Sequence, residues 1–376
     1  MAEPAKWLNP RFYLKREPML LAGLSAMAIA GFLAVAVLVR IYHAQQNSLG
    51  ERWFGRGVAE LKTQRFDHAA ADFRTALIYS RDNFLYQLNL AQALIGLRRG
   101  DEAYAYLINL WDQQPEHGVV NLELARVAAA KGDTEHALRY YHNAIYATWP
   151  GDEETERKNT RLELIGYLLK TGAKPQAEAE LVALAANAGD DPAEQEQLGD
   201  LFMQVQDYER ALSSYRTSLK EDHGSARAAA GAGFAAFELA RYPLAQHYLQ
   251  MAVAENPSDA DSARRLKTTD EVVRMDPFRR QISAAERYRV VMEAYEAAGD
   301  RLKACGALSA PEQNLNQDWA KLKPNVSERG LQHNPDLVNQ AMELVFKVER
   351  QTAANCGAPT QIDSALLLIA RLHEGG

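Results

Sequence analysis

The chain has 376 residues, of which 47% are apolar and 24% charged, and its formal net charge is -7. This apolar share is enough for a continuous core and excludes a disordered chain. Residues 1–18 hold four Lys and Arg against two Glu, so the remaining chain carries a charge of about -9. An acidic body excludes nucleic acid as the expected partner, because phosphate binding needs clustered Lys and Arg.

The composition favours helices throughout the chain. Pro is scarce, with 14 residues, whereas Ala, Leu, Glu, Gln and Arg are abundant. No run of alternating β-branched residues predicts a sheet. We therefore expect an all-α fold.

Residues 19–39 predict a transmembrane helix. They carry no charge, and Ser25 is the only polar side chain among them. A helix of this length is about 31 Å long, which matches the hydrocarbon core of a bilayer. The rival interpretation is a cleaved signal peptide. We favour an uncleaved anchor, because a signal peptide has a shorter apolar region and an Ala-x-Ala-like site after it.

Lys and Arg near this segment predict its orientation. Four of them lie in residues 1–18, whereas only Arg40 and Arg52 follow within about fifteen residues. Positively charged flanks stay in the cytoplasm. We therefore expect a single-pass protein of the inner (cytoplasmic) membrane, with residues 1–18 in the cytoplasm and the large remainder in the periplasm.

A period of 34 residues runs through the middle of the chain. In its clearest unit, Gly132 permits a tight turn between two helices, and Asp133 or Thr134 caps the second helix. Ala137 is small because the two helices approach closely there. An acidic insertion at 152–157 is expected to extend the first helix of the following unit. The six predicted units are residues 50–83, 84–117, 118–151, 158–191, 192–225 and 226–259.

This spacing of small, aromatic and Ala positions resembles the tetratricopeptide repeat (TPR) family. In one of the strongest units the recurring residues are Leu198, Gly199, Asp207, Tyr208, Ala211 and Tyr215. The resemblance covers residues 50–259 and implies a right-handed α-solenoid with a concave groove that binds proteins. A single helix pair cannot bury its apolar side alone, so neighbouring pairs must stack.

The resemblance also implies that the first helix of each unit lines the groove. Such a groove suits an extended segment or an amphipathic helix from a partner protein. An ordinary solvated face is the alternative. The Lys/Asn/Arg clamp with which chaperone-binding members hold a C-terminal carboxylate is absent, so we do not expect that ligand. The candidate groove residues are Leu88, Gln92, Leu122, Arg126, Leu162, Asp200, Phe234 and Phe237.

Residues 260–376 are expected to form a further helical region. Its first helix, over 260–275, should cap the last repeat, as solenoids require. Gly299-Asp300 resembles the turn of a degenerate repeat. The other helices that we predict cover residues 279–304, 334–354 and 360–373.

Cys305 and Cys356 are the only cysteines, and each begins a Cys-Gly pair at a predicted helix end. A disulfide between them would close a loop of about 50 residues and stabilise the fold by roughly 4 kcal/mol. It would also fit an oxidising compartment. Two unrelated buried thiols are the alternative, because sequence alone does not give connectivity.

No motif predicts catalysis, a cofactor or a metal site. The sequence lacks H-E-x-x-H, Cys-x-x-Cys, a phosphate-binding Gly-rich loop and G-x-S-x-G. We therefore expect no enzyme but a membrane-anchored scaffold or chaperone-like accessory factor of the bacterial envelope, with self-association left open. The alternatives are a cytoplasm-facing anchored regulator of envelope assembly and an enzyme with an unrecognised C-terminal domain.

Overall fold

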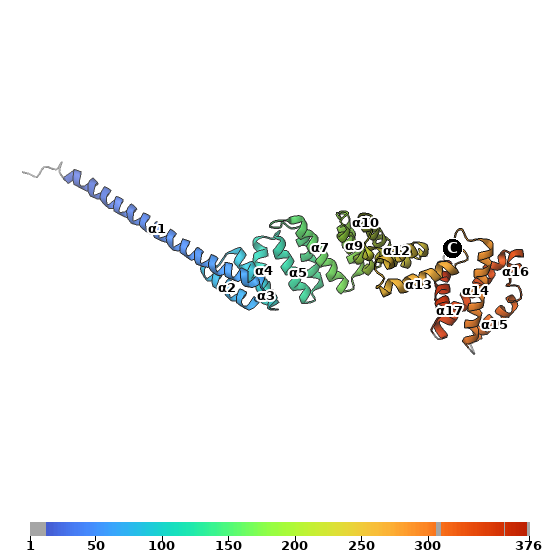
Figure 1. The fold of residues 1–376 in the computed structure, drawn as a ribbon. Helices are drawn as coiled ribbons and strands as arrows, with labels where there is room; N and C mark the ends of the chain where they lie inside the picture. The colour runs from blue at the N-terminus through green and yellow to red at the C-terminus, as the bar shows by residue number, and fades with distance from the viewer. Residues whose placement is uncertain (1–12, 306–309, 357, 374–376) are drawn as a thin grey trace, which may run out of the picture. The chain divides into compact units, whose positions relative to one another are not determined.

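The computed structural model describes residues 13–305, 310–356 and 358–373. Over these residues the regular secondary structure is helical, with one isolated bridge between His117 and Thr148 (Figure 1). The prediction of an all-α fold is confirmed. The chain divides into two compact units, residues 1–167 and 168–376, which are described separately here. Most of the predicted cytoplasmic segment, 1–18, lies outside the described residues.

Helix α1, Tyr13–Lys62, is a single helix of 50 residues (Figure 1). Its apolar part is long and apolar enough to cross a membrane by length and composition, with a mean hydropathy of 2.4 and none of it buried. It is the one such helix among the described residues. The last part of α1, from Gly50 onward, packs against α2, Phe66–Tyr79. The apolar segment and the first helix of the repeat array are therefore one continuous helix.

The rest of the first unit consists of successive antiparallel helices. Ala69, Ala103 and Ala137 occupy the same position in α2, α4 and α6, and all three are fully buried. A small side chain is needed there because the paired helices approach closely. The acidic insertion forms the first turn of α7, as expected. The helices that follow α2 are α3 Phe84–Gly96, α4 Gly100–Gln113, α5 Gly118–Ala130, α6 Thr134–Ile145 and α7 Glu153–Lys170.

The second unit continues with helices of the same length and spacing. Tyr215 on α10 is packed between Gly199 on α9 and Gly231 on α11, where an added Cβ would lie 2.7 Å and 2.3 Å from its ring. The two glycines therefore allow three helices to close around one aromatic ring. These helices are α8 Lys174–Ala185, α9 Pro192–Val205, α10 Tyr208–Glu221, α11 Ala226–Glu238, α12 Tyr242–Glu255 and α13 Ala260–Met275.

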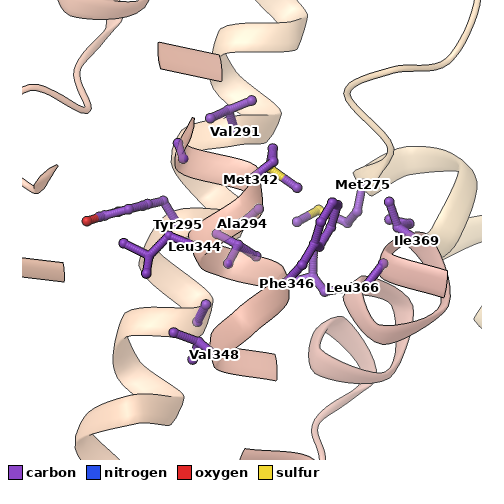
Figure 2. Packing of buried hydrophobic residues seen from close by; sticks show 14 of the residues in the cluster. Met275, Val291, Ala294, Tyr295, Met342, Leu344, Phe346, Val348, Leu366 and Ile369 are labelled. Atoms are coloured by element: carbon purple, nitrogen blue, oxygen red, sulfur yellow. The ribbon is translucent and has the colours of Figure 1, made fainter. Parts of the chain in front are cut away.

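The C-terminal helices pack on the end of this series around one apolar cluster. Figure 2 shows Met275 of α13 with Phe346, Leu366 and Ile369, and Tyr242 of α12 joins the same cluster. The C-terminal helices therefore cover apolar surface at the end of the helix pairs. They are α14 Ala284–Ala304, α15 Ala310–Leu322, α16 Glu328–His333, α17 Asp336–Asn355 and α18 Gln361–His373.

Two details of this region differ from the predictions. The helix expected over 279–304 begins only at Ala284, because Asp276 accepts a hydrogen bond from the backbone of Phe278 and holds a turn before it. Gly299 lies inside α14 and makes no repeat turn; it is close to Trp319, whose ring an added Cβ would approach to 2.7 Å. Helices α15 and α16 were not predicted.

Candidate functional site

In the first unit, Arg126 is the centre of a charged network. It donates two hydrogen bonds to Glu163, of 2.9 and 2.7 Å, and one to Glu123, of 3.1 Å. Gln92 donates to Glu123 at 3.0 Å, and the Tyr141 hydroxyl donates to Glu163 at 3.0 Å. The structure thus brings the predicted groove residues Gln92 and Arg126 together through a shared carboxylate.

The pKa values of the two carboxylates shift in opposite directions. Burial raises the pKa of Glu123, even though Arg126 and Gln92 favour its charged form. Burial also acts to raise the pKa of Glu163, but the hydrogen bonds and charge of Arg126 outweigh it and hold that pKa below its ordinary value. The guanidinium of Arg126 is therefore committed to protein carboxylates, and it offers no free cation for a ligand carboxylate.

The three apolar groove candidates of the first unit present little surface. Leu88 is 4% and Leu122 is 7% exposed, so both belong to the core. Leu162 is half-buried. The surface that this part of the groove face offers to a partner is consequently polar.

In the second unit, Asp200 and Phe234 line one hollow of about 540 Å³. Met203 also lines it, and Arg227 in the same lining pairs with Asp200. The Asp200 carboxylate also accepts a hydrogen bond of 2.6 Å from the hydroxyl of Tyr215. The hollow is therefore amphipathic, lined by apolar side chains and by a paired charge.

A second hollow of about 550 Å³ shares Phe234 and adds Phe237. The guanidinium of Arg265 lies 5.0 Å from the ring centre of Phe234 and 4.6 Å from that of Phe237, and it pairs with Glu238 at 2.7 Å. The two hollows together form a groove across α9, α11 and α13, which we call the unit 2 groove. It brings together three of the predicted residues: Asp200, Phe234 and Phe237.

A third feature lies at the C-terminal end of the second unit. Cys305, the C-cap of α14, and Cys356, the C-cap of α17, form a disulfide with Cα atoms 5.2 Å apart. Beside it the buried Arg301 donates to Asp363 at 2.9 Å, to the Thr352 hydroxyl at 2.8 Å and to the Cys356 carbonyl at 3.1 Å. One guanidinium therefore joins the end of α17 to the start of α18.

Glu349 is a second carboxyl beside this guanidinium. It is fully buried, lies 3.7 Å from Arg301, and neither of its oxygens has a hydrogen-bond partner. Burial, assisted by the nearby charge of Asp363 and opposed by Arg301, raises the pKa of Glu349 to about 8. At pH 7 the carboxyl is therefore mainly in its protonated, neutral form.

Comparison with known proteins identifies the repeats. A family model described as tetratricopeptide repeat matches residues 54–117 and residues 196–260. The chain carries tetratricopeptide repeats. This match confirms the prediction of TPR repeats and agrees with the helical pairs in residues 54–117 and 196–260, while the bounds of the six units stay a prediction. Repeats of this kind are protein–protein interaction modules. No curated protein matches the chain.

Solved structures, among them TPR proteins, are similar to parts of this chain at low identity. The C-terminal part of a TPR repeat-containing protein from Cytophaga hutchinsonii is 16% identical over 64% of this chain and 94% of that chain, with a TM-score of 0.46. YrrB, described as a TPR protein with an unusual peptide-binding site, is 17% identical over 51% and 96%, with a TM-score of 0.39. PilF of Pseudomonas aeruginosa is 14% identical over 57% and 90%, with a TM-score of 0.33.

Sequence analysis missed Arg265 and Arg301. Arg265 lies on α13, the helix that follows the last predicted TPR unit. We did not include α13 in the predicted groove, although this helix continues the spacing of the first helices of the repeats. Arg301 carries no signal of its own in the sequence, because its partners Thr352 and Asp363 lie 51 and 62 residues away. Among the described residues, no group of three or more His, Cys, Asp or Glu could hold a metal ion.

Proposed function

We propose that this protein is a membrane-anchored scaffold that binds a peptide segment of a partner protein in the unit 2 groove. The observation that carries the proposal is the pair of adjoining hollows over α9, α11 and α13, which share Phe234. The first helices of successive repeats line these hollows with half-buried aromatic rings and with charged side chains of both signs. A partner segment with apolar anchors and flanking charges fits this chemistry.

The lining favours an extended segment as the occupant. Arg227, Arg264 and Arg265 alternate along the groove with acidic side chains, and each is already paired with one of them. Binding therefore cannot depend on capture of a single free charge. Apolar contacts with Met203 and the two phenylalanines provide the affinity, and the charge pairs select the register of the bound segment.

The proposed location is the inner membrane of a bacterial envelope, with the repeats in the periplasm. The exposed apolar part of α1 supports a membrane anchor. The excess of Lys and Arg before this helix supports a cytoplasmic N-terminus. The paired Cys305 and Cys356 support an oxidising compartment for the C-terminal helices.

Site-specific photocrosslinking tests the groove. A benzophenone amino acid replaces Phe234 in the full chain in cells, and the matched control carries it at Tyr248, a half-buried aromatic residue on α12 outside the unit 2 groove. We expect a discrete crosslink to another polypeptide from position 234, which Met203→Asp abolishes. Equal crosslinking from positions 234 and 248, or none from 234, would overturn the assignment of the groove.

A further inference from the structure

A further hollow of the second unit lies between α13, α14 and α18, and we call it the C-terminal hollow. Its volume is about 790 Å³, and the disulfide between Cys305 and Cys356 is part of its lining. The start of α18 is held against α13, because the side chain of Gln361 donates a 3.1 Å hydrogen bond to the carbonyl of Lys267. This contact fixes two of the three helices that form the hollow.

The C-terminal hollow adjoins the unit 2 groove along one face of α13. Thr268 lines the groove, and Glu271 lines the C-terminal hollow. Residues three positions apart are neighbours on a helix surface. The repeat period agrees, because Glu271 is 34 residues after Phe237, which lines the groove, and Phe237 is 34 residues after Met203, which also lines it. The groove face therefore continues from α9 and α11 across α13 into this hollow.

The lining of the C-terminal hollow has an excess of negative charge. It contains the carboxylates of Glu271, Asp300 and Asp363 but one guanidinium, that of Arg301, which gives a balance of -2. Arg301 and Asp363 are buried and paired with each other at 2.9 Å, so this pair is committed to the fold. Glu271 and Asp300 remain as the carboxylates that a ligand can reach.

Both of these carboxylates can accept a further cation. Asp300 pairs with Lys303 at 2.8 Å, but the two side chains are 77% and 69% exposed, so water weakens this pair. Glu271 pairs with Arg274, which also donates a 2.8 Å hydrogen bond to Glu293. A ligand cation can therefore share Glu271 while Arg274 keeps a second carboxylate partner.

We propose that the partner segment bound in the unit 2 groove continues over α13 and places a Lys or Arg side chain in the C-terminal hollow. This inference rests on the proposed function of the groove. Long basic side chains lay their aliphatic part along apolar surface and keep the charged end in a polar setting. Ala297, Ala304 and Ile362 in the lining provide the apolar surface. The charged end would pair with Glu271 and Asp300.

The length of α13 sets the spacing that the partner segment needs. Asp261 in the groove and Glu271 in the C-terminal hollow are separated by about 15 Å along the helix axis. An extended segment covers this distance in about five residues. The basic residue should therefore lie about five positions from the residues that occupy the groove.

Selection from a library of displayed random peptides tests the proposal. The full chain is used in detergent without reductant, so that the disulfide in the lining stays formed. We expect the selected peptides to carry apolar residues and, about five positions from them, a Lys or Arg. Met203→Asp should abolish their binding, because Met203 lines the unit 2 groove.

A double-mutant cycle then identifies the contact. In the parent chain, replacing the basic residue of a selected peptide by Gln should weaken binding about fivefold, measured by fluorescence anisotropy. In the variant with Glu271→Gln and Asp300→Asn, the same peptide change should have less than about a twofold effect. The matched control carries Glu209→Gln and Glu221→Gln, which remove the same charge from exposed positions of α10 outside these hollows, and it should keep the full loss.

The inference and the proposed function fail in different ways. Selected peptides without a basic residue at that spacing, or an equal loss in the parent chain and in the variant with Glu271→Gln and Asp300→Asn, would overturn the role of the C-terminal hollow. The groove would keep its assignment in that case if Met203→Asp still abolished binding. Selection of no peptide, or of peptides that bind the Met203→Asp variant equally well, would overturn the proposed function and this inference with it.

Discussion

At the residue scale, Arg301 shows how one buried charge organises the C-terminal helices. Its guanidinium donates hydrogen bonds to the hydroxyl of Thr352, the carboxylate of Asp363 and the carbonyl of Cys356. Asp363 in turn accepts a 2.7 Å hydrogen bond from the backbone of Thr360, at the start of α18. Loss of the guanidinium would therefore remove a hydrogen bond from each of these three groups and leave the buried Asp363 carboxylate without its cation.

Replacing Arg301 by Met should be strongly destabilising. Removing one member of a buried charged network costs about 3–5 kcal/mol, because the remaining charge stays buried and unpaired. The matched control is Arg241→Met, which breaks an exposed pair with Glu209 and should cost less than about 1 kcal/mol. Urea unfolding of the two variants in detergent measures both free energies. Equal losses would contradict the account.

Glu349 gives the second residue-scale prediction. Its folded pKa is about 8, whereas a free glutamate titrates near 4.5. The folded state therefore keeps a proton that the unfolded state releases, so stability is full below pH 4.5 and falls as the pH rises toward 8. The slope contributed by this group is at most about 1.4 kcal/mol per pH unit.

Glu349→Gln should remove the pH dependence of stability that Glu349 contributes. The glutamine amide has nearly the same shape as the protonated carboxyl and does not ionise. Urea unfolding at pH 5.5 and pH 8 should show a smaller loss of stability for the variant than for the parent chain. Parallel pH profiles of the two proteins would show that Glu349 ionises normally in the folded state.

At the element scale, close contacts between helices depend on glycines, which leave room for a side chain of the neighbouring helix. Gly231→Ala would place a methyl group against the Tyr215 ring and should cost about 1–3 kcal/mol, since overpacking forces the helices apart. Gly166→Ala is the matched control. Gly166 lies within α7, and an added Cβ there would meet no neighbouring atom within 4 Å. That control should be neutral or stabilising by up to about 1 kcal/mol through helix propensity. Thermal unfolding followed by circular dichroism compares them, and a neutral Gly231→Ala would contradict the packing.

The disulfide is the other feature that acts on whole elements. Cys305 and Cys356 are 51 residues apart, and closing such a loop stabilises by about 4 kcal/mol in the chain-entropy model. Reduction should therefore lower the hydrogen-exchange protection of α17 and α18 while α9 to α12 keep theirs. A uniform loss over the second unit, or none, would contradict a local role for the bridge.

Periodic features of the fold could be predicted from the sequence, and long-range polar contacts could not. Ala137 and Tyr215 recur at a fixed spacing, so their packing follows from the repeat. Leu88 and Leu122 were expected to line the groove but are buried, because neighbouring first helices pack closely in the first unit. The Arg301 network depends on residues more than 50 positions apart that no period relates.

At the scale of the whole molecule, an apolar helix continues into the repeat array without a linker. In the proposed arrangement, α1 holds the first repeat near the bilayer, and the second unit carries the groove and the bridged C-terminal helices. Under the proposed topology, the partner segment binds on the periplasmic side of the membrane. The cytoplasm-facing regulator differs from this account only in the side of the membrane that the repeats occupy.

The most direct test of the central claim is thiol labelling in intact cells. A membrane-impermeant maleimide is applied to cells that express the full chain, with and without a reductant. We predict that Cys305 and Cys356 react only after reduction and without opening the inner membrane, which places the array in the periplasm with its bridge formed. Labelling that needs opened cells but no reductant would place the array in the cytoplasm and contradict the account.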